Sequence, residues 1–267
     1  ENTSDTPIGF PKKMRNKLFS AQKIKSLGDS LKFIFSLRPS DFIPVRPAVA
    51  EYTTGRTMGQ DCDIMAASYE ISRDQQDDFA LRSHQLADIA ETKGYLKNEM
   101  CEVSLEPKFK VIKSDNGIRP NSKREKLASL RAAFDKKHGT LTAANSSSIS
   151  DGAAALVLAS SDMVEANGLT VRGRIMGHAS FAQAPGWFTT APVYAAQKLL
   201  TKIGWRTDDV DLWEVNEAFA VVPMAFMREL NLSSEIVNIY GGACALGHPI
   251  GASGARILVS LINAMER

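Results

Sequence analysis

The sequence contains little cysteine. Three residues, Cys62, Cys101 and Cys244, lie far apart in a chain of 267 residues. An odd and sparse set argues against a disulfide scaffold and for a reducing compartment. No pair of cysteines has the close spacing of a zinc site, and the four histidines are scattered along the chain. We therefore expect no metal centre.

Long apolar runs and an excess of charge are also missing. No apolar run approaches the roughly 18 residues that span a bilayer, and the polar, acidic residues 1–5 are unlike a signal peptide. The net charge of +2 argues against nucleic-acid binding. A hydrophobic fraction of 44% in a chain of this length supports a sizeable core without disulfides or metal. Because the chain does not begin with Met and stops inside a predicted helix, we expect it to be cut at both ends.

Residues 12–38 form a basic amphipathic stretch, in which apolar residues recur at three- and four-residue steps. Lysines and arginines surround them, against the single acid Asp29. Two interpretations stay open: a solvated helical pair packed on the body of the protein, or a surface that contacts anionic lipid or an acidic partner subunit. Gly28 is expected to break the stretch into two helices. Pro39, Pro44 and Pro47 predict an extended loop after it.

The remaining chain predicts an α/β fold. Residues 57–95 are expected to be helical, with a capping box at Ser72 and Gln75, and His84 is interpreted as a surface residue. Residues 101–125 predict short strands and turns. The continuous apolar run at 153–159 predicts a strand buried on both faces. Helices are then expected at about 161–167, 190–204, 217–230 and from 252, alternating with strands at about 171–179, 210–215 and 235–240. This alternation favours a largely parallel or mixed sheet, with a domain boundary near 150.

The segment 240–256 is the strongest functional signal. Glycines and alanines stand on both sides of His248, where they let the backbone turn sharply and approach a ligand closely. Pro249 fixes the chain just after the histidine. The helix predicted after the loop points its free N–H groups and partial positive charge back at His248. That field favours a neutral imidazole, the form that a general base needs.

A second signal is the motif Glu-Val-Asn-Glu-Ala-Phe-Ala at 214–220. Asn216 and Glu217 emerge from an apolar run at the predicted end of a strand, which is where α/β folds bind ligands. An asparagine there can donate to an oxyanion directly or through a bound water. Taken alone, the same residue could equally be a helix cap.

The two motifs together resemble the C-terminal half of the thiolases. The segments 130–134 and 139–152 also resemble the thiolase chain that leads out of the coenzyme-binding loop domain. The likeness covers essentially the whole sequence, in the right order. Asn-Gly-Ile-Arg-Pro at 116–120 and the long basic stretch are most similar to fatty-acid-degrading thiolases, including the β subunits of trifunctional β-oxidation complexes. Asn216, however, stands where those subunits usually carry a histidine.

The resemblance implies a layered αβαβα thiolase-like fold, incomplete here and with an inserted loop domain. It places a coenzyme-A-binding loop domain at 1–149, the last strand and helix of the N-terminal half at 150–170, and a truncated C-terminal half at 171–267. It implies cleavage of 3-ketoacyl-CoA by coenzyme A through an acyl-cysteine, with coenzyme A as substrate and no cofactor. A bacterial cytoplasmic or mitochondrial homo-oligomer, in some thiolases part of a multienzyme complex, is expected.

The resemblance also assigns residues. His248 would be the base that activates the nucleophilic cysteine, and Asn216 would hold an oxyanion-hole water. Coenzyme A and the acyl chain would contact seven positions: Arg119, Phe134, Ala143, Ser147, Met58, Ala218 and Phe219. The family's nucleophilic cysteine would lie upstream of residue 1 and its second cysteine beyond residue 267, so the three cysteines present are interpreted as packing residues. Two alternatives remain, a β-ketoacyl synthase and a non-catalytic protein that binds coenzyme A or lipid.

Overall fold

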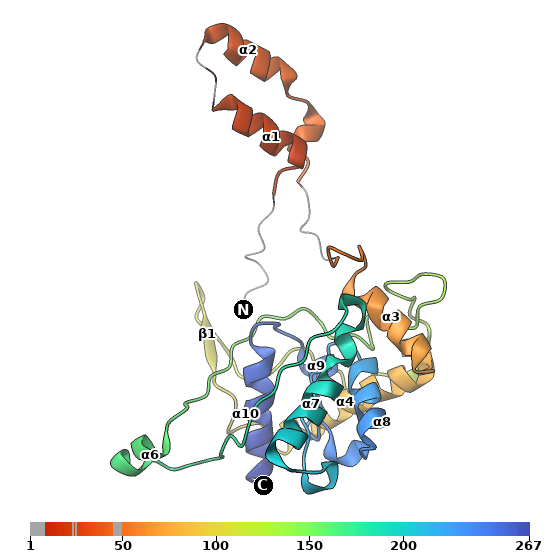
Figure 1. Ribbon diagram of the computed structural model, residues 1–267, viewed down its shortest axis with the longest axis vertical. Coiled ribbons are helices and arrows are strands. Elements are labelled where there is room, and N and C mark those ends of the chain that lie inside the picture. The colour runs from red at the N-terminus through yellow and green to blue at the C-terminus, as the bar shows by residue number, and fades with distance from the viewer. Residues whose placement is uncertain (1–8, 23, 25, 45–49) are drawn as a thin grey trace. The chain divides into compact units, whose positions relative to one another are not determined.

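The computed structural model describes residues 9–22, 24, 26–44 and 50–267 (Figure 1). The chain divides into two compact units, a small one at 3–49 and a large one that holds 50–267. Within the described ranges, no helix is long and apolar enough to cross a membrane. The thiolase-based division at 149 and 170 is a different one and stays a prediction.

The small unit is a helical hairpin. Helix α1 (Lys12–Ala21) and helix α2 (Leu27–Ser36) are followed by the short 3-10 helix η2 (Pro39–Phe42). The prediction that Gly28 separates the helices is wrong, because Gly28 lies in the first turn of α2. Ser26 starts that helix, and its side chain accepts a hydrogen bond from the backbone N–H of Asp29. The predicted extended loop is likewise replaced at Pro39 by η2. Pro47 of the predicted loop and two lysines of the basic stretch, Lys23 and Lys25, lie outside the described residues.

The large unit begins with two capped helices, α3 (Met58–Ser68) and α4 (Arg73–Thr92). The predicted capping box at Ser72 and Gln75 is confirmed, since each side chain bonds the other residue's backbone N–H. Thr57 and Gln60 form the same device at the start of α3. The helical prediction for 57–95 is confirmed apart from a short break between α3 and α4.

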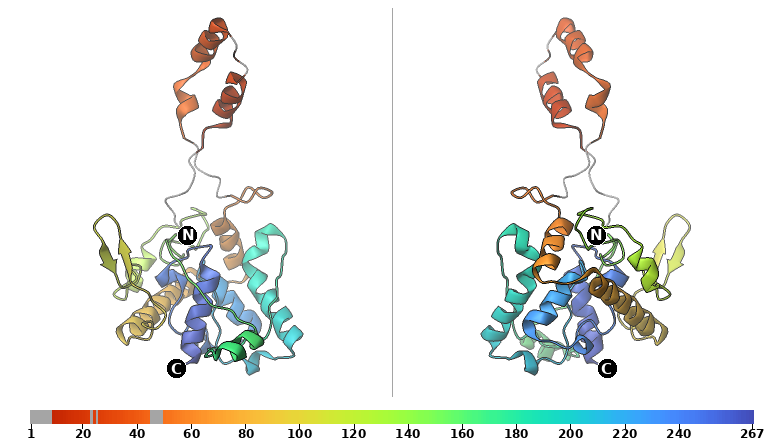
Figure 2. Two further views of the ribbon diagram at one scale, coloured as in Figure 1. Left: turned by 90° about the vertical axis from the view of Figure 1, so that its left-hand side faces the viewer. Right: turned by 90° about the vertical axis from the view of Figure 1, so that its right-hand side faces the viewer.

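A hairpin and a short helix follow. Strands β1 (Val103–Leu105) and β2 (Lys110–Ile112) pair antiparallel, with Ser104 opposite Val111, as the expected mixture of short strands and turns requires. Figures 1 and 2 show this hairpin projecting from the large unit. Helix α5 (Arg124–Ala128) then packs on α4.

The second half of the large unit is mostly helical. Its elements are α6 (Ser161–Asn167), η3 (Pro185–Thr190), α7 (Ala191–Ile203), η4 (Thr207–Asp209), α8 (Val221–Leu230), η5 (Ser234–Ile236), α9 (Ala243–Leu246) and α10 (Ser253–Met265). Three of the four predicted helices are confirmed nearly to the residue. The helix expected from 217 begins only at Val221, because Phe219 forms a β-bridge with Ser146 and the N–H of Ala220 bonds the carbonyl of Asn145.

The strands predicted at 153–159 and 171–179 are not formed in the described part of the chain. Val157 is 95% exposed and Ile175 is 69% exposed, so neither segment is buried on both faces. A strand is stable only when a neighbour completes its hydrogen bonds, and here both segments run extended without one. The strands predicted at 210–215 and 235–240 survive as one parallel bridge between Trp213 and Val237. Figure 1 shows the two extended segments carrying α6 away from the other helices.

The core lies between the helices. One cluster joins α3 to α8 through Cys62, Met65 and Val221, and a second surrounds Val237 with Phe226 of α8 and Val193 of α7. A third cluster, around Phe79 of α4 and Cys244 of α9, places α4 directly beneath the histidine loop. The loop that carries the strongest sequence signal is therefore supported by a buried helix.

Candidate active site

The histidine loop (240–252) is folded tightly. The backbone of Gly247 has a φ of 87°, a conformation that side chains other than glycine rarely adopt. A Cβ atom at this position would also collide with the hydroxyl group of Ser150. Gly152 approaches from the same segment, where an added Cβ would lie 2.7 Å from Pro249. The small residues of the motif thus allow the 148–152 segment to close over the loop.

His248 is fixed by contacts on three sides. Its backbone N–H donates to the carbonyl of Ser148 over 3.0 Å. Its ring nitrogen Nδ1 lies 2.6 Å from the hydroxyl of Ser253, and both ring nitrogens lie 3.4 Å from Nδ2 of Asn216. The structure therefore brings together the two residues that the sequence predicted as catalytic from separate motifs.

Glu217 anchors the loop from below, a role that the sequence analysis did not identify. Its side chain is fully buried and accepts three hydrogen bonds. The donors are the hydroxyl of Ser83 on α4 at 2.7 Å, the amide of Asn238 at 2.8 Å and the backbone N–H of Cys244 at 3.0 Å. Ser83 also accepts the N–H of Gly242. One carboxylate thereby ties α4, the end of the 210–215 segment and the histidine loop together.

The cysteines divide into two kinds. Cys244 is buried in the loop with its thiol toward the carbonyl of Glu217, and burial raises its pKa well above the ordinary value. Cys62 is fully buried between α3 and α8, and burial also raises its pKa strongly. Both are packing residues, as the sequence predicted. For Cys101 that prediction is wrong, because this residue is exposed.

A neighbouring loop meets the histidine loop through Gly117. An added Cβ at Gly117 would lie 2.5 Å from the carbonyl oxygen of Ala245, so the two backbones are in contact. Two residues later, the N–H of Arg119 donates to Nδ1 of His84 over 3.1 Å. The interpretation of His84 as a surface residue is therefore wrong. His84 is 8% exposed, and burial and the charge of Arg119 lower its pKa. His84 is thus a neutral hydrogen-bond acceptor, and its contact with the backbone N–H of Arg119 fixes the loop that carries this arginine.

Five of the seven predicted coenzyme A positions gather at one place. The rings of Phe134 and Phe219 meet edge to face with 5.7 Å between centroids. Ser147 donates to the carbonyl of Ala218 through both its backbone N–H and its hydroxyl. Phe134 lies against Gly59, next to Met58, whose side chain is exposed. Ala143 and Arg119 are exposed at other points, and no contact places them in this cluster.

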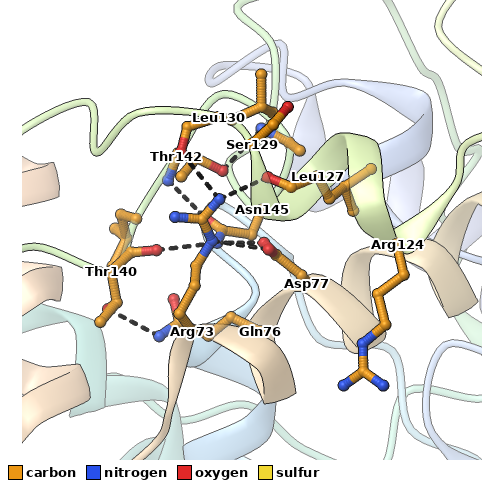
Figure 3. A network of polar contacts seen from close by, with 12 residues as sticks. Arg73, Gln76, Asp77, Arg124, Leu127, Ser129, Leu130, Thr140, Thr142 and Asn145 are labelled. Carbon is orange, nitrogen blue, oxygen red and sulfur yellow. Dashed lines mark hydrogen bonds and ion pairs between the residues drawn. The ribbon is translucent and has the colours of Figure 1, made fainter.

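The segment that carries Ala143 and Ser147 is held by a polar network on α4 (Figure 3). Asp77 accepts from Arg73 at 2.7 Å and from the amide of Asn145 at 2.9 Å. Asn145 in turn accepts the backbone N–H of Thr142. Gln76 donates to the hydroxyl of Thr140 at 2.9 Å. Side-chain hydrogen bonds of this kind hold an irregular loop in place where no strand pairing does so.

Two hollows flank these residues. One, of about 610 Å³, lies beside the histidine loop and is lined by Gly152, Ala153, Ala154, Ile250, Gly251, Ala252 and Ala255. The other, of about 360 Å³, lies beside Phe134. Its lining includes the basic side chains of Arg56, Lys136 and His138 together with Asp63 and Asp135. The lining of this hollow therefore carries charges of both signs, and Arg56 is already paired with Asp61.

Known proteins resemble the chain over its whole length. Residues 40–162 match the N-terminal domain of the thiolases, and residues 169–267 match the thiolase C-terminal domain. The 3-ketoacyl-CoA thiolase of Pectobacterium carotovorum is 36% identical over 286 residues, and that of Yersinia pestis is 38% identical over 286 residues. Each match takes in 100% of this chain and 65% of the relative, so the chain spans about two thirds of their length.

Solved structures agree with these matches. The Bacillus anthracis acetyl-CoA acetyltransferase has a TM-score of 0.79 and 38% identity, over 82% of this chain and 56% of that protein. Human mitochondrial 3-ketoacyl-CoA thiolase in complex with CoA has a TM-score of 0.76 and 33% identity, over 82% of this chain and 55% of that protein. The likeness confirms the predicted α/β fold class of the thiolase type.

Proposed function

Because the chain belongs to the thiolase family, we propose that it forms part of an acyltransferase that cleaves 3-ketoacyl-CoA with coenzyme A in fatty-acid degradation. The products are acetyl-CoA and an acyl-CoA shortened by two carbons, and the reverse reaction is a condensation. The observation that carries the proposal is the contact between Asn216 and His248, which lie 32 residues apart in sequence and 3.4 Å apart in space. Coenzyme A is a substrate, and the proposed reaction needs no separate cofactor.

In this reaction, His248 is the base. It takes the proton from a cysteine thiol, and the thiolate attacks the keto carbon of the substrate. The bond between that carbon and the α carbon then breaks, and the proton that His248 took passes to the departing enolate, which gives acetyl-CoA. The thiol of a second coenzyme A gives its proton to His248 and attacks the acyl-cysteine. The acyl-CoA leaves, and the proton on His248 returns to the cysteine thiolate.

Asn216 supports the oxyanion. Its Oδ1 atom is buried and has no hydrogen-bond partner within the described residues. A bound water that donates one hydrogen to Oδ1 keeps its other hydrogen for the oxygen on which negative charge develops. The amide group of Asn216 meanwhile faces the ring of His248, so both groups act at the same point.

Neither Cys62 nor Cys244 is proposed as the attacking thiol, because Cys62 is enclosed in the core between α3 and α8 and the thiol of Cys244 packs against the carbonyl of Glu217. Cys101 lies two residues after Glu99, whose carboxylate bonds Ser260 and Asn263 of α10. Ser260 and Asn263 lie about two and three turns, or roughly 10 and 15 Å, along the helix from the Ser253 contact with His248. We therefore expect the 267-residue chain alone to give no thiolysis.

The natural protein that contains this chain provides the test. Replacing His248 by Ala removes the base, and we expect kcat for thiolysis of a 3-ketoacyl-CoA to fall about 10²- to 10⁴-fold. Calorimetric binding of coenzyme A should be unchanged. As a control, Cys244→Ala should keep its activity within a few-fold, because its thiol only packs against Glu217.

Three outcomes would contradict the proposal. A natural protein that binds coenzyme A without any turnover would be a non-catalytic binding protein. Turnover that survives His248→Ala but is lost in Cys244→Ala would move the nucleophile into the loop. Activity toward an acyl carrier protein in place of coenzyme A would instead indicate a β-ketoacyl synthase.

The helical hairpin suits a second role, peripheral contact with an anionic membrane. Nine apolar side chains in this small unit are 40% or more exposed: Phe10, Leu18, Phe19, Leu27, Leu31, Ile34, Phe35, Phe42 and Ile43. Lys12, Lys13 and Arg15 are exposed beside them. Lys17 is not available to a partner, since it pairs with the buried Asp41 at 2.5 Å. Apolar groups bordered by cations are typical of interfacial helices.

We expect the chain to bind phosphatidylserine-containing vesicles in a co-sedimentation assay, and added salt to weaken that binding. Phe35→Ser should lower the affinity about tenfold or more, because Phe35 is 84% exposed and would enter the interface. The matched control is Tyr52→Ser, since Tyr52 is 99% exposed in the large unit. Equal binding of Phe35→Ser and unmodified chain, or equal binding to neutral vesicles, would rule this surface out.

Assembly and compartment are also proposed from the family. The protein is expected to form a homo-oligomer in the bacterial cytoplasm or the mitochondrion. A β-oxidation multienzyme complex is a further partner that fits the proposed substrate. Size-exclusion chromatography with light scattering on the natural protein measures its oligomeric state directly.

A further inference from the structure

The ring of His248 meets the hydroxyl group of Ser253, the first residue of α10. Ser253 Oγ lies 2.6 Å from His248 Nδ1 and 2.9 Å from the carbonyl oxygen of Pro249. Ser253 is only 4% exposed, so solvent has little access to this hydroxyl. Its hydrogen bonds are therefore decided by the protein.

The hydroxyl carries a single hydrogen, and its two neighbours differ. The carbonyl oxygen of Pro249 can only accept, whereas His248 Nδ1 donates when protonated and accepts when not. With the proton on Nδ1, Ser253 accepts from the ring and donates to the carbonyl, so both contacts are hydrogen bonds. With the proton on Nε2, one hydrogen faces two acceptors, and one of the contacts becomes a repulsion between lone pairs.

Asn216 does not distinguish the two ring nitrogens. Its Nδ2 group is a donor only and lies 3.4 Å from both of them. An equal distance to both nitrogens places the amide against the ring and not along the lone pair of either one. Ser253 is therefore the contact that favours one tautomer.

We infer that Ser253 is a positioning residue, which holds neutral His248 as the Nδ1–H tautomer with the lone pair on Nε2. This inference rests on the proposed function only for its consequence, that Nε2 is the atom that takes the proton from the attacking thiol. As Nε2 gains that proton the ring becomes cationic, and its Nδ1–H bond to Ser253 becomes charge-assisted. Ser253 thus stabilises the protonated base, while its own hydroxyl hydrogen stays in the hydrogen bond to the carbonyl oxygen of Pro249.

The tautomer is measured directly by ¹⁵N NMR of the ring nitrogens in the 267-residue chain labelled at histidine. Spectra are recorded at about pH 9, well above the ordinary histidine pKa of about 6.5, and His248 is assigned from the signals lost in His248→Gln. We expect Nδ1 to carry the proton and Nε2 to be unprotonated. In Ser253→Ala the two signals should move toward a mixture of tautomers, whereas Ser253→Thr should keep the wild-type pattern.

The matched control is Ser260→Ala. Ser260 is equally buried on the same helix and bonds Glu99 instead of His248, so its loss should leave the His248 signals unchanged.

In the natural protein, Ser253→Ala should lower kcat about tenfold at a nearly constant KM for coenzyme A, and Ser253→Thr should restore it. The inference is overturned if wild-type Nε2 carries the proton or if Ser253→Ala leaves both signals in place. The wild-type and Thr spectra decide the matter even if the Ala variant fails to fold. A natural protein without thiolase activity would refute the proposed function and leave the tautomer result standing.

Discussion

Replacing Glu217 by Ala is expected to lower the free energy of unfolding by about 3 to 5 kcal/mol. The substitution leaves three buried donors without their acceptor: the hydroxyl of Ser83, the amide of Asn238 and the N–H of Cys244. It also leaves a cavity where a fully buried side chain stood. Urea denaturation followed by circular dichroism measures the loss. A loss below about 1 kcal/mol would show that the carboxylate does not anchor the loop.

Two further variants separate the charge from the volume of Glu217. Glu217→Gln keeps the shape but turns one acceptor into an amide donor, which then opposes the donors Ser83 and Cys244. We expect it to lose a large part of the stability that Glu217→Ala loses, because the mismatch is in hydrogen bonding and the packing is kept. Glu235→Ala is the control, since Glu235 is exposed and its removal should change stability by no more than about 0.5 kcal/mol.

Features set by neighbours in sequence were predictable. The capping box at Ser72 and Gln75 needs two residues three positions apart, and it is present as expected. Helices α6, α7 and α10 follow their local signals, among them Gly168 and Gly204 in left-handed conformations at the ends of α6 and α7. The pairing of His248 with Asn216 was implied by the resemblance to the thiolases, and the structure holds the segments that lead to them together through the Trp213–Val237 bridge.

Features set by distant residues were not predictable. His84 stands among charged neighbours in sequence, but on α4 it shares a face with the buried residues Ala80 and Ala87. Three- and four-residue spacing to those alanines was the signal that could have identified it. Glu217 was visible as a polar residue in an apolar run, yet its donors come from three separate segments. The run at 153–159 had the composition of a buried strand, but a strand also needs a partner, and composition does not supply one.

A second, half-buried carboxylate belongs to Glu214, three residues before Glu217. Glu214 has its Oε2 atom buried without a hydrogen-bond partner in the described part of the chain. Burial raises the pKa of Glu214 to about 8. The charge of Arg256 acts against this increase, and the charges of Glu217 and Glu99 add to it. The guanidinium of Arg256 is also buried and unpartnered among the described residues. Partial loss of hydration raises the pKa of the half-buried Glu99 and of Asp115, whose residue is exposed overall, with Arg256 acting against the shift in both.

Glu214 should therefore make the protein less stable as pH rises from about 4.5 to about 8. In this window the folded state holds a proton that the unfolded state has released, so the free energy of unfolding falls by about 1.4 kcal/mol per pH unit. The stability is fully present below the unfolded pKa, and a total on the order of 5 kcal/mol is lost by the time pH passes the folded value. Glu214→Gln mimics the protonated form and removes this contribution.

The variant Glu214→Gln should match the wild type in stability at about pH 4 and exceed it progressively up to about pH 8, above which the difference is constant. Urea denaturation at four or five pH values measures this difference, and the remaining slope belongs to groups such as Glu99 and Asp115. Glu165→Gln, an exposed change on α6, should run parallel to the wild type throughout. If Glu214→Gln also runs parallel, Glu214 is ionised in the folded protein and paired with Arg256. That pair would then supply the missing partner of both side chains, and the segment that leads to Asn216 would be held by an ion pair instead of carrying a protonated Glu214.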